Sequence, residues 1–227
     1  MPPVKITISP PEVFEPYDSL PVKIRRARRS QAMFQIMQRI SFNNTYESEN
    51  LFESLIRSAT KHGGSTPIIS DPNNPNVTYR SLIARAFILS ELLEPDLKEI
   101  RRVGILLPST VAAATVFFAL QYLGKEVVLL NFSGGITPLM KAISISKVEY
   151  VITSSAFVDI AGIHEEISSI RNEAKVTFLE DVKKCVTTGS KLRGFVKALL
   201  TKYLSQTHRN DPEPEHCAVI LFTSGSE

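Results

Sequence analysis

The pattern of apolar residues predicts alternating helices and strands from about residue 46 to the end of the chain. Short runs without polar alternation predict buried strands at 67–70, 102–107, 126–130, 150–153, 175–179 and 218–222. Stretches with helical periodicity or an almost wholly apolar composition predict helices at 51–60, 78–93, 110–123, 138–146, 156–172 and 189–204. Because continuous apolar strands alternating with helices are typical of α/β proteins, we predict a mostly parallel sheet with helices on both faces.

The first 45 residues differ from this pattern. Residues 4–9 alternate between apolar and polar positions and predict a half-buried strand, which prolines at 10, 11 and 16 separate from a helix at 21–40. That helix begins with five cations within 23–29. They form either a solvated face or a contact with anionic lipid or an acidic protein. The polar stretch 43–50 predicts a boundary between domains 1–45 and 46–227.

The helix predicted at 189–204 is amphipathic, with cations on the flanks of its apolar stripe. Packing against the sheet and lying in a membrane interface both fit this pattern, and the sequence leaves the two open. The stripe consists of Leu192, Phe195, Val196, Leu199, Leu200, Tyr203 and Leu204.

Local signals predict the ends of several elements. Thr78 and Ser109 are the expected N-caps of the helices that follow them. Residues 71–76 are expected to form a tight turn. Gly134–Gly135 follows a strand and is expected to form a plain turn, with close approach of the backbone to a ligand as the alternative.

Composition narrows the class of protein. With 43% hydrophobic residues and a net charge of +3, the chain is an ordinary globular protein that requires no nucleic-acid partner. The longest apolar run holds about half of the roughly 20 residues that a membrane span needs, so we predict a cytoplasmic protein. Cys185 and Cys217 have neither metal nor redox spacing and are expected to be buried apolar residues in a reducing compartment.

Established catalytic patterns are absent from the sequence. The four histidines form no metal-ligand spacing, and no G-x-S-x-G elbow, Walker loop or G-x-G-x-x-G fingerprint occurs. We therefore predict neither a metal site nor a catalytic residue within these 227 residues.

The candidate binding site is the stretch at the end of the chain. The strand 218–222 leads into Thr223, Ser224, Gly225, Ser226 and Glu227. Hydroxyls and backbone N–H groups around a glycine, directly after a buried strand, are suited to binding phosphate.

This stretch resembles the opening of the phosphate-binding loop of the adenylate-forming enzymes, the superfamily of acyl-CoA synthetases, luciferases and peptide synthetases. Three upstream segments, 78–80 (Thr-Tyr-Arg), 103–108 (Val-Gly-Ile-Leu-Leu-Pro) and 130–135 (Leu-Asn-Phe followed by Gly135), are similar to elements of that superfamily. The resemblance implies that residues 46–227 form an incomplete N-terminal subdomain of the adenylate-forming fold. It also implies ATP and Mg²⁺ as cofactors, with Thr223–Ser226 contacting the β- and γ-phosphates and Glu227 continuing the loop.

Within the superfamily, the chain resembles the bifunctional 2-acylglycerophosphoethanolamine acyltransferase/acyl-carrier-protein synthetases. Glu227, the segments 178–182 and 191–194, and the basic N-terminal helix carry this similarity. It implies that residues 1–45 are a C-terminal remnant of a glycerolipid acyltransferase domain. The implied function is activation of a fatty acid, transfer to acyl carrier protein and then to a lysophospholipid, at the inner face of a bacterial inner membrane.

The sequence departs from that family in what it lacks. The acyltransferase His/Asp motif and the Gly, Pro and Lys-Gly that complete the phosphate loop are absent. Carboxylates at Glu227 would oppose a triphosphate, and residues 219–222 would expose an apolar sheet edge. We therefore expect a truncated part of the enzyme that does not bind ATP or act alone, from a split or decayed gene or with a complementing polypeptide. The alternative is a non-catalytic module that binds a membrane or a partner through its basic amphipathic helices.

Overall fold

The computed structural model describes residues 21–45, 50–204 and 217–222. The chain divides into two compact units, residues 1–48 and 49–227. The described part of the first unit is one helix, α1 (Val22–Thr45), at the place where the sequence predicts one. The strand predicted at 4–9 lies outside the described residues. The larger second unit contains the sheet.

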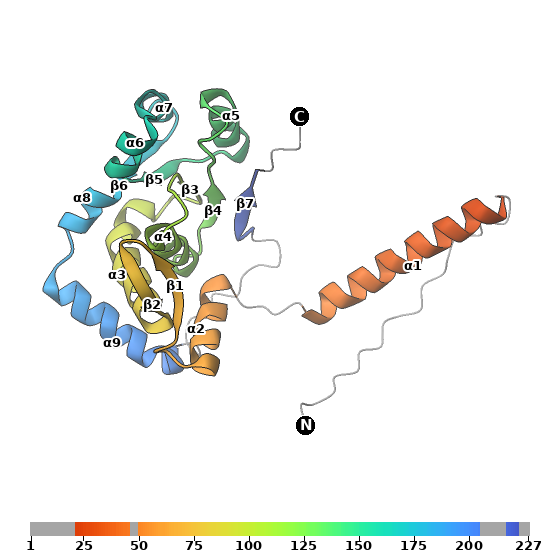
Figure 1. Ribbon diagram of the computed structural model, residues 1–227, viewed down its shortest axis with the longest axis horizontal. Coiled ribbons are helices and arrows are strands. Elements are labelled where there is room, and N and C mark those ends of the chain that lie inside the picture. Colours follow the sequence, from red (N-terminus) through yellow and green to blue (C-terminus); the bar gives the residue numbers. More distant parts are fainter. Residues whose placement is uncertain (1–20, 46–49, 205–216, 223–227) are drawn as a thin grey trace. The chain divides into compact units, whose positions relative to one another are not determined.

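Five parallel strands form the sheet of the second unit in the order β6-β5-β3-β4-β7 (Figure 1). Each strand is short, apolar and at a position that the sequence predicts. The strands are β3 (Arg102–Ile105), β4 (Glu126–Leu129), β5 (Tyr150–Thr153), β6 (Lys175–Phe178) and β7 (Val219–Leu221). The predicted α/β class with a parallel sheet is therefore confirmed.

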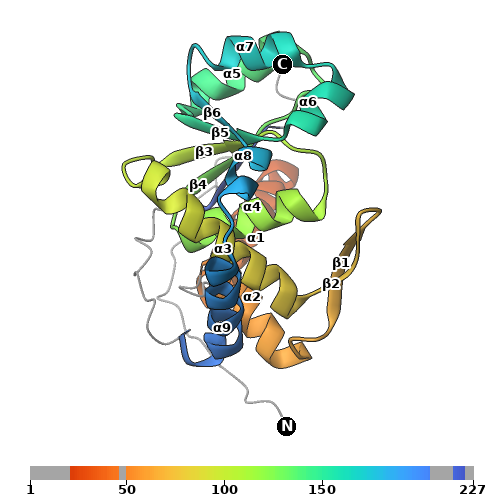
Figure 2. The same ribbon diagram turned by 90° about the vertical axis from the view of Figure 1, so that its left-hand side faces the viewer.

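Helices cover both faces of this sheet, as the continuous apolar strands require (Figure 2). Alternate residues of β3 show the two faces: Val103 and Ile105 belong to the apolar core on one side, while Leu106, just beyond the strand, belongs to the core on the other. One core is built with α3 (Tyr79–Leu97) and α4 (Val111–Tyr122). The other is built with α5 (Ile136–Ser146), α6 (Ser155–Ala161) and α7 (His164–Ile170).

A two-stranded hairpin precedes the sheet and corrects one prediction. The stretch 71–76 is not only a turn, because β1 (Pro67–Asp71) pairs antiparallel with β2 (Asn74–Thr78). The sequence pattern did not predict β2, because asparagine and proline, which β2 contains, are depleted in strands. Helix α2 (Leu51–His62) lies before the hairpin and starts with a capping box between Asn50 and Glu53.

The helices after β6 also differ from the prediction. A short helix, α8 (Leu179–Lys184), follows β6 directly and was not predicted. Helix α9 (Thr188–Leu204) is present, but Leu192, Phe195, Val196, Leu199 and Leu200 of its predicted stripe are exposed and do not pack against the sheet. Its buried side carries the small residues Ser190, Gly194 and Ala198, which lie against α3. Small residues allow the backbones of two helices to approach closely. This close contact with α3, and not the apolar stripe, determines which side of α9 is buried.

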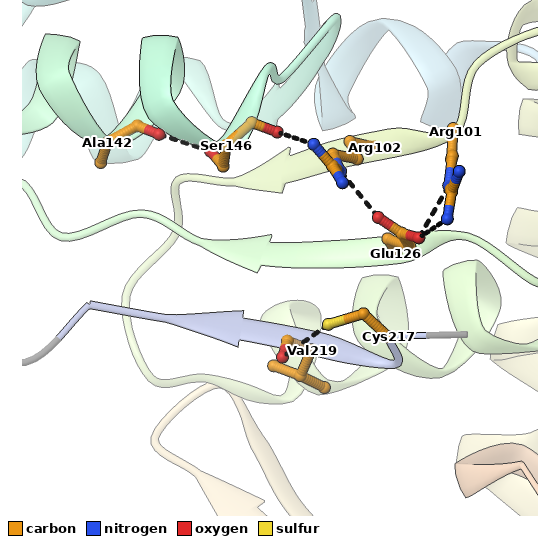
Figure 3. Close-up of polar contacts among 7 residues, drawn as sticks. All are labelled: Arg101, Arg102, Glu126, Ala142, Ser146, Cys217 and Val219. Carbon is orange, nitrogen blue, oxygen red and sulfur yellow. Dashed lines mark hydrogen bonds and ion pairs between the residues drawn. The ribbon is translucent and has the colours of Figure 1, made fainter. Parts of the chain in front are cut away.

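An ion cluster ties the amino ends of β3 and β4 together (Figure 3). Glu126 is 1% exposed and accepts hydrogen bonds of 2.7 Å from Arg101 Nε and Arg102 Nε. Arg102 Nη1 also donates to the carbonyl oxygen of Ser146, at the end of α5, at 3.0 Å. Burial raises the pKa of Glu126, but the hydrogen bonds and charges of Arg102 and Arg101 outweigh it and lower the pKa below its ordinary value.

Two further predictions can be compared with the structure. Cys185 and Cys217 are exposed and not buried, so the expectation that they act as buried apolar residues is wrong. Both lie at element ends, where a short side chain does not reach the core. Within the described ranges, the structure holds no helix with both the length and the apolar character to cross a membrane.

Candidate functional site

The carboxyl ends of the five parallel strands meet at one edge of the sheet. The register aligns Ile105 with Leu129 and Ile152, and Leu129 in turn with Leu221. Strand β7 therefore also ends at this edge, and Phe222 and Thr223 follow it in the sequence. The five predicted phosphate-binding residues, Thr223, Ser224, Gly225, Ser226 and Glu227, lie outside the described residues.

The order in which strands are added to the sheet reverses between β3 and β5: β4 is added on one side of β3, and β5 and β6 are added on the other. The connection from β3 runs through α4 to β4 on one side, and the connection from β5 runs through α6 and α7 to β6 on the other. The two sets of helices lie on opposite faces. In open α/β sheets, ligands bind at the carboxyl edge where such a reversal occurs.

Helix α4 begins at this edge, and the protein's own side chains cap it. Thr110 is the N-cap, not Ser109 as predicted, and its Oγ1 accepts a hydrogen bond from Ala113 N at 3.4 Å. Asp71, from the hairpin, accepts a hydrogen bond from Val111 N at 2.8 Å. This hydrogen bond is the main reason why the pKa of Asp71 lies below its ordinary value.

Helix α6 begins directly after β5 and is capped by Glu180 from the first turn of α8. Ser154 Oγ donates to Glu180 Oε1 at 2.8 Å, and the backbone nitrogens of Ser155 and Ala156 donate to the same carboxylate at 3.0 and 3.3 Å. Partial burial raises the pKa of Glu180, but these hydrogen bonds outweigh it and lower the pKa to about 2. Glu180 is therefore ionised at neutral pH and places a negative charge at the start of α6.

Helix α5 begins differently, beside the end of β7. Its N-cap is Gly135, at φ 80°, and among the described residues no side chain caps it. The loop before it forms a turn in which Asn131 Oδ1 accepts hydrogen bonds from Ser133 N and Oγ at 2.9 and 2.8 Å. The turn predicted at Gly134–Gly135 is confirmed. The first N–H groups of a helix have no intrahelical partner, so this end of α5 offers donors to a ligand.

The arrangement favours binding of an anion near β4 and β7, and not near α4 or α6. Of the helices that start at this edge, α4 and α6 already hold a carboxylate, and α8 carries Glu180 and Asp181 in its own first turn. The start of α5 has free donor capacity and follows β4, the strand that pairs with β7. The described part of the chain contains no cluster of side chains suited to a metal ion. Sequence reasoning did not identify Asp71 or Glu180, because both act on helices distant from them in sequence.

Comparison with known proteins places this architecture in a family. Residues 55–227 match the family model described as "AMP-binding enzyme". This match covers most of the chain, so the chain belongs to the AMP-binding enzyme family, the adenylate-forming enzymes.

Solved structures show the same fold. VinN in complex with 3-methylaspartate is 19% identical, with a TM-score of 0.56, over 78% of this chain and 44% of that chain. A second crystal structure of VinN gives the same identity and TM-score, over 77% of this chain and 42% of that chain. The five-stranded sheet with its flanking helices thus matches the N-terminal subdomain of adenylate-forming enzymes. This chain spans less than half the length of these structures.

Proposed function

We propose that this chain supplies the first part of the site in which a carboxylic acid is activated by ATP as an acyl-adenylate. The observation that supports the proposal is that β7, the last strand of a family-matching sheet, ends at the carboxyl edge, and that the Thr-Ser-Gly-Ser stretch follows it in the sequence after Phe222. Thr223–Ser226 would contact the β- and γ-phosphates through hydroxyl and backbone N–H groups. ATP and Mg²⁺ are the cofactors of this proposal.

The finer proposal concerns the acid and its acceptors. The chain's resemblance to the bifunctional acyltransferase/acyl-carrier-protein synthetases supports a fatty acid, acyl carrier protein and a lysophospholipid as the reaction partners. It also supports reading residues 1–45 as the end of an acyltransferase domain. The only charged side chain in 223–227 is that of Glu227. The isolated segment 1–227 is therefore expected to bind ATP too weakly for catalysis, because no cation in the loop offsets the triphosphate charge.

The test is ATP–pyrophosphate exchange by the intact polypeptide that contains this chain, measured with a fatty acid. Replacing Thr223→Ala and Ser226→Ala together should lower the exchange rate on the order of a hundredfold, because two phosphate contacts are lost. Ser168→Ala is the matched control, since Ser168 is an exposed hydroxyl on α7 that donates to His164 within its own helix.

An exchange rate that survives the double substitution would contradict the placement of the phosphates. Fatty-acid-dependent exchange that is robust in isolated 1–227 would contradict the view that further groups are needed. Exchange that requires a different carboxylic acid would overturn only the finer proposal.

A further inference from the structure

Helix α9 lies along α3 (Figure 2). It packs there through its small residues, which leaves its large apolar residues exposed. Ser190, Gly194 and Ala198 are buried against α3. A Cβ atom at Gly194 would lie 3.1 Å from the carbonyl oxygen of Ala84 and would collide with the side chain of Ile88. The close approach of the two backbones therefore fixes which side of α9 faces away from α3.

The outward side of α9 is a continuous apolar face. Leu192 is 65% exposed and Leu199 is 48% exposed, and Phe195, Val196 and Leu200 between and beside them are also exposed. These five residues follow the i, i+3, i+4, i+7, i+8 pattern of one helix face. Single exposed apolar residues are common on soluble proteins, but a contiguous group marks a surface that contacts something else.

Cations border this face on both sides. At about 100° per residue, Lys191 lies on one flank, and Arg193 and Lys197 lie on the other. Arg193 is held in place by an ion pair of 2.6 Å with Glu91, and Lys197 Nζ lies 5.9 Å from the ring centre of Phe87. The sequence of α9 contains no Asp or Glu, so every charge that α9 itself contributes to the rim is positive, and among the described residues the one carboxylate paired with these cations is Glu91 of α3.

We propose that this surface, the α9 face, docks onto an anionic lipid bilayer. The α9 face consists of Leu192, Phe195, Val196, Leu199 and Leu200, bordered by Lys191, Arg193 and Lys197. The apolar residues enter the boundary between headgroups and acyl chains, while the cations meet the lipid phosphates. A second copy of the chain is a poorer occupant, because a symmetric contact would bring two cationic rims together. The surface is separate from the carboxyl edge and does not depend on the proposed adenylation.

The test is co-sedimentation of the intact polypeptide with lipid vesicles. Wild-type protein should bind vesicles that contain phosphatidylglycerol more strongly than vesicles of phosphatidylcholine alone, and added salt should weaken the binding. Phe195→Asp with Leu199→Asp should weaken it at least ~tenfold, because two apolar anchors are lost and two negative charges face the lipid.

Two variants complete the experiment. Ile160→Asp is the matched control: Ile160 is an exposed apolar residue on α6, which covers the other face of the sheet, and its change should leave binding as in wild type. Lys191→Glu should weaken binding to anionic vesicles and flatten its salt dependence. All substitutions are at exposed positions, and circular dichroism verifies that each variant is folded.

Three results would overturn the proposal. The first is wild-type protein that does not bind anionic vesicles, and the second is a Phe195→Asp, Leu199→Asp variant that binds as well as wild type. The third is a wild-type dimer in sedimentation velocity that this variant abolishes without any change in vesicle binding, which would assign the α9 face to a second copy.

Discussion

At the scale of single residues, two carboxylates distant in sequence from their targets organise the carboxyl edge. Asp71 accepts from the first N–H of α4, and Glu180 accepts from the first N–H groups of α6. Neither could be recognised from the sequence, since an acidic residue after a strand is common and its partner lies 40 or 25 positions away. By contrast, Thr78 was predicted correctly as a cap, because its partner, Ser81 N, is three residues along the chain.

Glu180 gives the structure a defined response to acid. Its pKa of about 2 lies below the ordinary value of 4.5, so its charged form stabilises the folded state above pH 4.5. This contribution is lost as the pH falls from about 4.5 to about 2. Glu180→Gln should lower the free energy of unfolding by ~1–3 kcal/mol at neutral pH, and the difference from wild type should disappear near pH 2.

Urea unfolding at a series of pH values measures this difference. Glu165→Gln, at an exposed position on α7, controls for the loss of one negative charge. A difference between wild type and Glu180→Gln that stays constant from neutral pH to pH 2 would show that the carboxylate charge does not hold α6.

At the scale of elements, the sequence predicts strands better than it predicts what helices contact. All five sheet strands coincide with apolar runs in the sequence, because strands of a parallel sheet covered on both faces need apolar residues on both sides. Helix α9 shows the limit. Its apolar stripe left open whether it packs against the sheet or lies in a membrane interface, and the buried side is the small one, because Gly194 allows closer contact with α3 than Leu192 would. Strand β2 was missed because Asn74, Pro75 and Asn76 are poor strand formers, and β1 supplies their pairing.

The two arginines of the ion cluster that joins β3, β4 and α5 should contribute unequally to the free energy of unfolding. Arg102 is 29% exposed and bonds to both Glu126 and Ser146, whereas Arg101 is 62% exposed and bonds to Glu126 alone. Arg102→Ala should lower the free energy of unfolding by ~2–3 kcal/mol, because it leaves a buried carboxylate half-paired and removes a donor from α5. Arg101→Ala should lower it by ~1 kcal/mol or less, since solvent replaces the lost partner.

Thermal and urea unfolding of the two variants, compared at the same pH, measure this contrast. Equal losses, or a larger loss in Arg101→Ala, would contradict the view that the less exposed arginine holds the three elements together.

At the scale of the whole molecule, the chain carries a family-matching sheet whose two edges have different roles. The amino edge holds the Arg101, Arg102 and Glu126 cluster and is a stabilising feature. At the carboxyl edge, helices α4, α5 and α6 begin and strand β7 ends. The fold class could be predicted from the pattern of apolar strands alone. The candidate site could be predicted only from its last strand and the hydroxyl-rich stretch after it, because the capping contacts depend on the tertiary fold.

The most direct test of these different roles of the two edges is amide hydrogen exchange of the intact polypeptide that contains residues 1–227, with and without MgATP and a fatty acid. Amide exchange should slow in 131–137 and 223–226, because the proposal places the loop before α5 and the hydroxyl-rich stretch beside the nucleotide phosphates. Exchange at Arg101, Arg102 and Glu126 should stay unchanged, because these residues lie at the opposite edge. Unchanged exchange at the carboxyl edge, or slower exchange confined to the amino edge, would contradict the account.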